Sequence, residues 1–283
     1  MVIKMKAKET DGGVLLTGIN YFDLDQTLDC GQCFRFDKLP DGAWHGVAGR
    51  HPLTLGKSGE EILLHGISLE EYEAFWRGYF DIDRDYEAIR RSYLTHPALS
   101  QCAMYAPGIR ILRQDAWEAL ISFIISQNNN IKRIKGIIAR LCGLFGDQIE
   151  DSVDFAFPEP QRLAALEESD LAPLRAGWRA GYILDAARKT ANGEIDLARI
   201  AEMPLDDART ALRTICGVGP KVADCVLLYG MSRTDAFPLD VWMKRAMATL
   251  FDGGNAADFG EHPGIAQQYI FHFARMHPEK LFA

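Results

Sequence analysis

The sequence predicts an α+β protein in which an N-terminal antiparallel β-sheet domain is followed by a mostly α-helical domain. Up to about residue 66, the apolar segments are short, rich in β-branched and aromatic residues, and separated by Gly, Asp and Pro turns. These predicted strands are 13–19, 33–36, 43–48 and 61–65, with one helical turn expected at 24–28. From Ser68 onward the apolar residues have helical spacing. We place the domain boundary so that the two domains cover 1–98 and 99–283.

Helices are predicted at 70–78, 86–94, 114–125, 131–144 and 264–275 from this spacing. Gly146 suits the position just after the fourth of them, where glycine commonly ends a helix. Asn128, Asn129 and Asn130 separate two apolar helices, and asparagine is a poor helix former and a good loop former. An ordinary interhelical loop explains them, and so does a loop whose amides contact bases.

The segment 208–229 predicts two helices joined by the tight turn Gly217-Val218-Gly219-Pro220. Glycine tolerates positive φ and close approach of a ligand, and proline suits the first position of a helix. The N–H groups of such a helix start attract an anion such as a DNA phosphate. Lys221 lies in the first turn of the second predicted helix, where the helix dipole favours the neutral amine. Lysines act as nucleophiles through Schiff bases. A surface cation is the alternative explanation of this lysine.

Asp240 precedes an apolar-periodic segment that includes Val241 and Met243, so it is predicted to cap a helix. That role alone accounts for a short polar residue at this position. The functional interpretation is a carboxylate held at a helix start and facing Lys221 across a cleft. The two roles are compatible.

Composition limits the classes of protein to which the chain can belong. Its 283 residues are 48 % hydrophobic, which suffices for one large or two modest cores. No apolar segment has membrane-spanning length or signal-peptide character, so we expect a soluble, cytoplasmic protein without membrane contact. A net charge of −8 means that DNA binding would depend on a local patch and backbone amides. Of six cysteines only Cys30 and Cys33 are closely spaced, and no second pair completes a zinc site.

The glycine hairpin, Lys221 and the Pro-x-Asp element at 238–240 together resemble the helix-hairpin-helix (HhH-GPD) DNA glycosylase superfamily. The sequence Gly-Val-Gly-Pro-Lys-Val-Ala-Asp-Cys from Gly217 is similar to that of its 8-oxoguanine DNA glycosylase branch. The resemblance implies base excision repair by a bifunctional DNA glycosylase/AP lyase that flips out and removes 8-oxoguanine opposite cytosine. It also implies that two helical lobes of the second domain flank the active-site cleft.

The resemblance implies roles for residues along most of the chain. Lys221 would attack the sugar, and Asp240 would stabilise the developing positive charge. The pocket for the flipped base would be formed by Gly31, Cys225, Gln267 and Phe271. The residues implied to contact DNA are Asn128 in the vacated stack, Arg133 and Arg179 at the unpaired cytosine, Trp178 as a wedge, and Gly217 and Gly219 at the hairpin.

Within this pocket, the Gly31 carbonyl would accept a hydrogen bond from N7–H of the oxidised base, because N7 of normal guanine is itself an acceptor. Simpler explanations stay open without the family: Gly31 as a turn glycine, Trp178 as a half-exposed core residue, and 264–275 as a core helix. Trp242 stands where eukaryotic members have a phosphate-contacting histidine, which leaves this phosphate contact unassigned. No cysteine follows Cys225, so the iron–sulfur cluster of the endonuclease III branch is not expected.

We expect no required redox cofactor or catalytic metal, and we leave open a structural cation at the hairpin carbonyls. The expected partner is double-stranded DNA containing an oxidised guanine, bound by a monomer at the nucleoid, or in the nucleus of a eukaryote. Three alternatives are a glycosylase for another damaged base, a non-catalytic helix-hairpin-helix DNA-binding protein, and a redox protein using Cys30 and Cys33. The last of these lacks a surrounding βαβ pattern.

Overall fold

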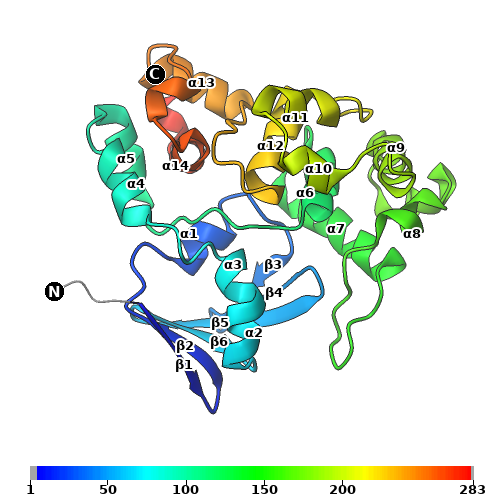
Figure 1. Cartoon of the computed structure of the whole chain (residues 1–283), viewed down its shortest axis with the longest axis horizontal. Helices are drawn as coiled ribbons and strands as arrows, with labels where there is room; N and C mark the ends of the chain where they lie inside the picture. The colour runs from blue at the N-terminus through cyan, green and yellow to red at the C-terminus, as the bar shows by residue number, and fades with distance from the viewer. Residues whose placement is uncertain (1–4, 282–283) are drawn as a thin grey trace. The chain divides into compact units, whose positions relative to one another are not determined.

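The computed structural model (Figure 1) describes residues 5–281. The chain forms two compact units. The first unit contains the chain up to Gly46, Leu53–Arg113 and the chain from Leu239 onward. The second contains Val47–Pro52 and Gln114–Pro238. Each unit is discontinuous in sequence, because the last helices of the chain belong to the first unit and Val47–Pro52 belongs to the second. The sequential division into 1–98 and 99–283 stays a prediction.

The N-terminal part of the chain forms the predicted antiparallel sheet, with the strand order β1-β2-β6-β5-β4-β3 (Figure 1). Register pairs Val14 with Leu64 and Leu16 with Ile62, so one face of two neighbouring strands is aliphatic and buried. Leu55, which lies opposite Leu64, continues this face. The strands are β1 (Lys6–Thr10), β2 (Gly13–Thr17), β3 (Phe36–Lys38), β4 (Trp44–Ala48), β5 (His51–Ser58) and β6 (Glu61–His65).

Some strands differ from the prediction. The strand predicted at 33–36 is wrong except for Phe36, because the preceding residues form bends in which the Cys33 thiol donates to the Leu28 carbonyl at 3.6 Å. Strands β1 and β5 are additional to those predicted. β1 is exposed at nearly every residue and lies at the sheet edge, so it has no buried alternation to detect. In β5 the buried Leu53 and Leu55 are mixed with Pro, Thr and Gly.

The helix predicted at 70–78 is present but irregular. α2 (Leu69–Glu71) opens into the π-helix η1 (Tyr72–Trp76) before α3 (Arg77–Tyr79). Tyr72 and Trp76 are buried in the core, and Trp76 stacks on Phe80 with ring centroids 5.6 Å apart. The other helices of the first unit are α1 (Leu24–Leu28), α4 (Tyr86–Tyr93), α5 (Pro97–Tyr105), α13 (Val241–Leu250), η4 (Ala256–Phe259), α14 (Pro263–Met276) and η5 (Pro278–Lys280). Those predicted at 24–28, 86–94 and 264–275 are confirmed to within one residue at each end.

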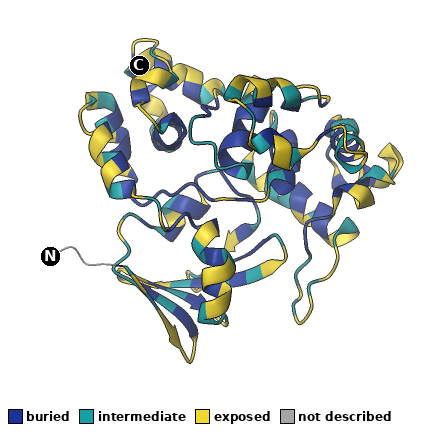
Figure 2. Ribbon diagram, in the orientation of Figure 1, coloured by how far each residue is buried: buried dark blue, intermediate teal, exposed yellow. Residues whose placement is uncertain are grey.

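The second unit is helical and is built on α6 (Ala116–Ser126), whose residues 117–125 are all buried (Figure 2). Phe123 of this helix stacks on Tyr229 with ring centroids 5.2 Å apart. The other helices are α7 (Ile131–Phe145), α8 (Pro160–Ala164), η2 (Glu168–Leu174), α9 (Arg179–Ala191), α10 (Leu197–Ala201), α11 (Leu205–Leu212), α12 (Pro220–Cys225) and η3 (Val226–Gly230). The predictions at 114–125 and 131–144 are confirmed, with Gly146 at the C-cap. Among the helices of residues 5–281, none combines the length and the hydropathy needed to span a bilayer.

A buried arginine connects irregular segments of the first unit. Arg110 is 4 % exposed, and its guanidinium donates to the carbonyls of Asn20, Tyr21 and Asp81 at 2.8–3.0 Å. It also lies over the Tyr86 ring, 4.5 Å from the centroid. Carbonyls that lack a backbone partner need another donor when water is excluded, and the Arg110 side chain donates to three such carbonyls.

We expect Arg110→Met to lower the free energy of unfolding by about 3 kcal/mol, because it removes the donors of several poorly hydrated carbonyls. Urea denaturation measures this change. The matched control is Lys38→Met, which breaks an ion pair with Asp25 whose two side chains are about half exposed and should cost under about 1 kcal/mol. Equal losses in the two variants would contradict the role assigned to Arg110.

Candidate active site

The predicted glycine hairpin is present between α11 and α12. Gly217 has φ +79°, and the Val218 amide donates to the Ile215 carbonyl at 3.0 Å, which closes the turn. A Cβ atom at Gly217 would lie 2.1 Å from the Tyr182 ring, so both the backbone conformation and the space require glycine. Pro220 begins α12 as predicted. Gly219 has φ −89° and is under neither constraint.

An ion pair joins the two helices of this hairpin. Arg209 Nε of α11 donates to Asp224 Oδ1 of α12 at 2.7 Å, and the aspartate is buried. Burial raises the pKa of the Asp224 carboxyl above its ordinary value, and the Arg209 guanidinium opposes that rise. Since Lys221 lies on the same short helix as Asp224, the pair also fixes the helix that carries the lysine.

Lys221 is half-buried against α6. Its Nζ lies 3.5 Å from Ser126 Oγ and 5.2 Å from the centroid of the Phe123 ring. Ser126 Oγ in turn donates to the Phe123 carbonyl at 2.8 Å. Cys225 follows Lys221 by one helical turn on α12 and is 3 % exposed. The amine therefore stands at a helix start, half-buried and beside an aromatic face.

The segment from Gln127 to Asn130 is the predicted loop between α6 and α7. Asn128 is exposed and adopts φ +46°, an uncommon conformation that asparagine tolerates better than most residues. The next two asparagines are structural, since Asn129 Nδ2 donates to the Ile125 carbonyl at 3.1 Å and Asn130 caps α7. Only Asn128 of the three presents its side chain at the loop surface without such a capping role.

Arg179 holds this loop. Its guanidinium donates to the carbonyls of Gln127, Asn128 and Ala176, and the residue is 2 % exposed. Its neighbour Trp178 is 50 % exposed and lies over the guanidinium, with a distance of 4.3 Å from Arg179 Cζ to the ring centroid. These contacts bring the predicted wedge and the predicted gap-filling loop together in the second unit.

Arg133 follows the loop that contains Asn128. It is exposed on the first turn of α7, and its Nη2 donates to the Arg175 carbonyl at 3.2 Å. The candidate residues Asn128, Arg133, Trp178, Arg179, Gly217, Gly219, Lys221 and Cys225 all lie in the second unit.

The remaining candidates lie in the first unit. Gln267 and Phe271 are one turn apart on α14, with Gln267 3 % exposed. Gly31 has φ +86° and lies in the bend that follows α1. Gln268 Nε2 of α14 donates to the Cys30 carbonyl at 3.0 Å and so connects the helix to this bend.

Asp240 is the N-cap of α13, as predicted. Its Oδ1 accepts from the Met243 amide at 2.8 Å. This hydrogen bond uses one carboxylate oxygen and fixes the orientation of the other. Trp242, at the position of the family's phosphate-contacting histidine, is the second residue of the same helix.

The cysteines have a structural character. All six are free thiols, and five of them are buried. The Cys30 thiol donates to the Thr27 carbonyl at 3.2 Å, and burial raises its pKa to about 12. A buried thiol whose pKa is raised is a poor redox nucleophile.

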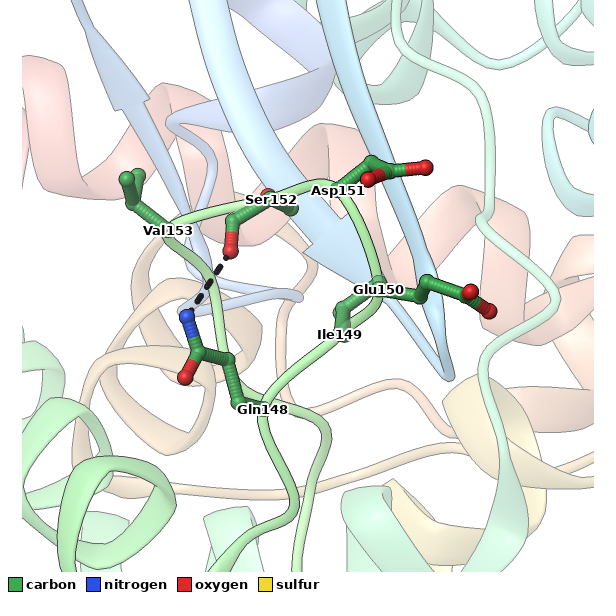
Figure 3. A pocket seen from close by; sticks show the side chains of 6 residues that line it. All are labelled: Gln148, Ile149, Glu150, Asp151, Ser152 and Val153. Carbon is green, nitrogen blue, oxygen red and sulfur yellow. Dashed lines mark hydrogen bonds between the residues drawn. The ribbon is translucent and has the colours of Figure 1, made fainter.

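A surface hollow elsewhere in the second unit is lined by residues 148–153 (Figure 3). Gln148 Nε2 donates to the Ser152 carbonyl at 3.2 Å across this loop. Glu150 and Asp151 are exposed and point to the same side of it (Figure 3). The hollow contains none of the candidate residues, and its acidic side chains would repel a phosphate.

Two family models match the chain. The N-terminal domain of 8-oxoguanine DNA glycosylase matches residues 14–120, and the HhH-GPD superfamily of base excision DNA repair proteins matches residues 121–257. The chain belongs to this superfamily, in its 8-oxoguanine DNA glycosylase branch. A probable N-glycosylase/DNA lyase of Methanothermobacter thermautotrophicus is 33 % identical over 238 residues, which are 73 % of this chain and 74 % of that protein.

Solved structures of this glycosylase family have the same fold. The Clostridium acetobutylicum 8-oxoguanine glycosylase/lyase, in complex with double-stranded DNA containing cytosine opposite 8-oxoG, is 34 % identical with a TM-score of 0.91. That similarity covers 98 % of this chain and 100 % of the other. MBOgg1, in complex with a low-affinity DNA ligand, is 39 % identical with a TM-score of 0.91, covering 97 % and 99 % of the two chains.

The structure adds site residues that the sequence analysis did not identify. They are polar side chains that contact the candidate site residues or the elements that carry them: Ser126 at Lys221, the Arg209–Asp224 pair across the hairpin, and Gln268 at the peptide before Gly31. Gln268 offers one sequence signal, since it is a second amide among the apolar residues of α14 and must find a partner when buried. The other contacts depend on tertiary structure.

We expect Gly217→Ala to lower the free energy of unfolding by about 3 kcal/mol, because the new Cβ atom meets the Tyr182 ring and disfavours positive φ. The matched control is Gly219→Ala, two residues away, where φ is negative and no atom lies within 4 Å of an added Cβ. This control should change stability by under about 0.5 kcal/mol. Thermal or urea unfolding compares the two, and similar effects would refute the packing argument.

Proposed function

We propose that this chain is a bifunctional DNA glycosylase/AP lyase that excises 8-oxoguanine opposite cytosine from double-stranded DNA in base excision repair. The observation that carries the proposal is Lys221, an amine in the first turn of the hairpin helix α12 and beside Ser126 and Phe123. The names of its relatives, N-glycosylase/DNA lyase and 8-oxoguanine glycosylase/lyase, support both the chemistry and the substrate.

The proposed chemistry uses side chains alone. Lys221 Nζ, as a neutral amine, attacks C1′ of the sugar while the bond from C1′ to N9 breaks, and the base leaves with the bonding electrons and a proton. Asp240 stabilises the positive charge that develops on the sugar and helps to remove the proton of the attacking amine. Ring opening gives a Schiff base, and loss of a proton from C2′ expels the 3′ phosphate. These steps require no redox cofactor or catalytic metal, and a structural cation at the hairpin carbonyls stays open.

Recognition of the base is assigned to four residues. The Gly31 carbonyl would accept from N7–H of the lesion, and Gln267 would contact its Watson–Crick edge. Cys225 and Phe271 would lie against the two faces of the flipped base. Their burial and helix positions support the assignment, since Gln267 and Phe271 share one face of α14.

Contacts to the rest of the DNA are assigned to the second unit. Asn128 would fill the vacated stack, the exposed Trp178 would insert as a wedge, and Arg133 would contact the unpaired cytosine. Arg179 would contact the same cytosine by exchanging some of its hydrogen bonds to the loop carbonyls for the base. The amides of Gly217 and Gly219 would bind a phosphate at the start of α12. We further propose that the enzyme acts as a monomer in the compartment that holds the DNA, which is the nucleoid, or the nucleus if the source is a eukaryote.

We expect borohydride to trap a covalent adduct between the wild-type protein and a duplex containing 8-oxoguanine opposite cytosine. Reduction converts the Schiff base to a stable amine, so the adduct survives denaturing electrophoresis. Lys221→Gln should form none, because an amide is not a nucleophile toward C1′.

Each outcome of the trapping experiment has a definite meaning. Trapping on an abasic site or on another damaged base, but not on this duplex, would keep the lyase and refute the substrate. Adduct formation by Lys221→Gln would refute the assignment of the nucleophile. No adduct on any of these duplexes would favour a non-catalytic DNA-binding protein.

We expect Arg133→Ala to reduce the preference for cytosine over adenine opposite the lesion by about tenfold, since one side-chain contact to a base edge contributes about 1–3 kcal/mol of discrimination. The measurement is kcat/KM for 8-oxoguanine release with each opposite base. Lys132→Ala, an exposed cation beside it on α7, is the control. Loss of Lys132 should weaken binding to all duplexes alike, and an unchanged preference in Arg133→Ala would contradict the assignment.

A further inference from the structure

We infer that Gln268 is a positioning residue for recognition of the damaged base, which acts by fixing the peptide that precedes Gly31. The inference deepens the proposed function and rests on the role that it assigns to the Gly31 carbonyl. Gln268 lies directly after Gln267 on α14. The helix that carries Gln267, assigned to the Watson–Crick edge of the base, therefore also anchors the bend that carries Gly31, assigned to N7–H.

The contact is buried and joins distant parts of the chain. Gln268 and Cys30 are both 0 % exposed, and Gln268 Nε2 donates to the Cys30 carbonyl at 3.0 Å. The two residues are 238 positions apart in the sequence. A buried amide donor and a buried carbonyl at this distance form a well-made hydrogen bond, and removal of the amide deprives a buried carbonyl of this donor.

A second amide holds the other side of Gly31. The side chain of Gln32 is also 0 % exposed, and its Nε2 donates to the carbonyls of Thr27 and Arg110 at 2.9 and 2.7 Å. Its Oε1 accepts from the Leu112 amide at 2.9 Å. Gly31 is thus a partly exposed residue between two buried neighbours. Gln268 holds the peptide that precedes Gly31, and the next residue, Gln32, is held by its own side-chain hydrogen bonds.

This arrangement matters because glycine has no side chain to fix its own backbone. At φ +86° Gly31 lies in a conformation that glycine enters and leaves readily, so its carbonyl direction depends on its neighbours. Discrimination by one N–H···O bond depends on distance and angle, and it weakens steeply when the angle falls toward about 120°. Without Gln268 the Cys30–Gly31 peptide loses its side-chain donor, and the neighbouring Gly31 carbonyl is positioned less firmly for the lesion.

The test separates base recognition from the chemistry at the sugar. Gln268→Met keeps the length and approximate volume of the side chain and removes the donor. Single-turnover rates are measured on two duplexes, one with 8-oxoguanine opposite cytosine and one with an abasic site. We expect 8-oxoguanine release to slow on the order of tenfold, while abasic-site cleavage, which involves no base, changes by less than about twofold.

The matched control is Ile270→Val, a buried aliphatic position two residues further along α14 to which no role in base recognition is assigned. It loosens the helix packing slightly and should change neither rate by more than about twofold. Equal slowing of both reactions in Gln268→Met, or no slowing of either, would overturn the inference. If the wild-type protein cleaves abasic sites but does not release 8-oxoguanine, the proposed substrate fails instead, and the two failures are thereby distinguished.

Discussion

Buried side-chain donors hold the loops that carry the candidate site, and the rest of the arrangement depends on this constraint. A loop has no backbone ladder, so its carbonyls must be satisfied by side chains or water. In this protein Gln32 and Gln268 serve the bend at Gly31, and Arg179 serves the loop at Asn128. Each donor is at most 3 % exposed, so each hydrogen bond is made where an unpaired carbonyl would be costly. Irregular backbone is thereby made rigid enough to present single atoms to a substrate.

The same constraint affects how an acidic protein binds DNA. With a net charge of −8, attraction must come from local groups, yet Arg179 and Arg209 use their donors inside the protein. The exposed Arg133 and the backbone amides at the start of α12 are among the groups of the second unit that we propose to contact DNA. Positive charge in this site is therefore divided between scaffold and contact, and the sequence alone does not show which arginine serves which purpose.

What the sequence could predict follows from the range of the interactions involved. The hairpin, the Asp240 cap and the loop at Asn128 depend on residues a few positions apart, and all three were predictable from local rules. Residues 33–35 are predicted as strand but form bends, because Phe34 and Phe36 resemble a strand pattern while the anchoring of the neighbouring Gln32 by Arg110 and Leu112 involves distant residues. The family resemblance points to Gly31 and Gln267, whereas the contact between Gln268 and the Cys30 carbonyl can be seen only in the folded structure.

The two proposed catalytic residues have charges that their helix starts do not explain. A cap requires an oxygen acceptor, and asparagine serves about as well as aspartate, so the negative charge of Asp240 is not needed to begin α13. The first turn of a helix favours acidic residues and disfavours a cation, yet α12 has Lys221 there and no acidic residue. Helix physics accounts for the positions of both residues and for the charge of neither. Sugar chemistry accounts for both charges, since it needs an amine that can give up a proton and a carboxylate that can stabilise a developing cation.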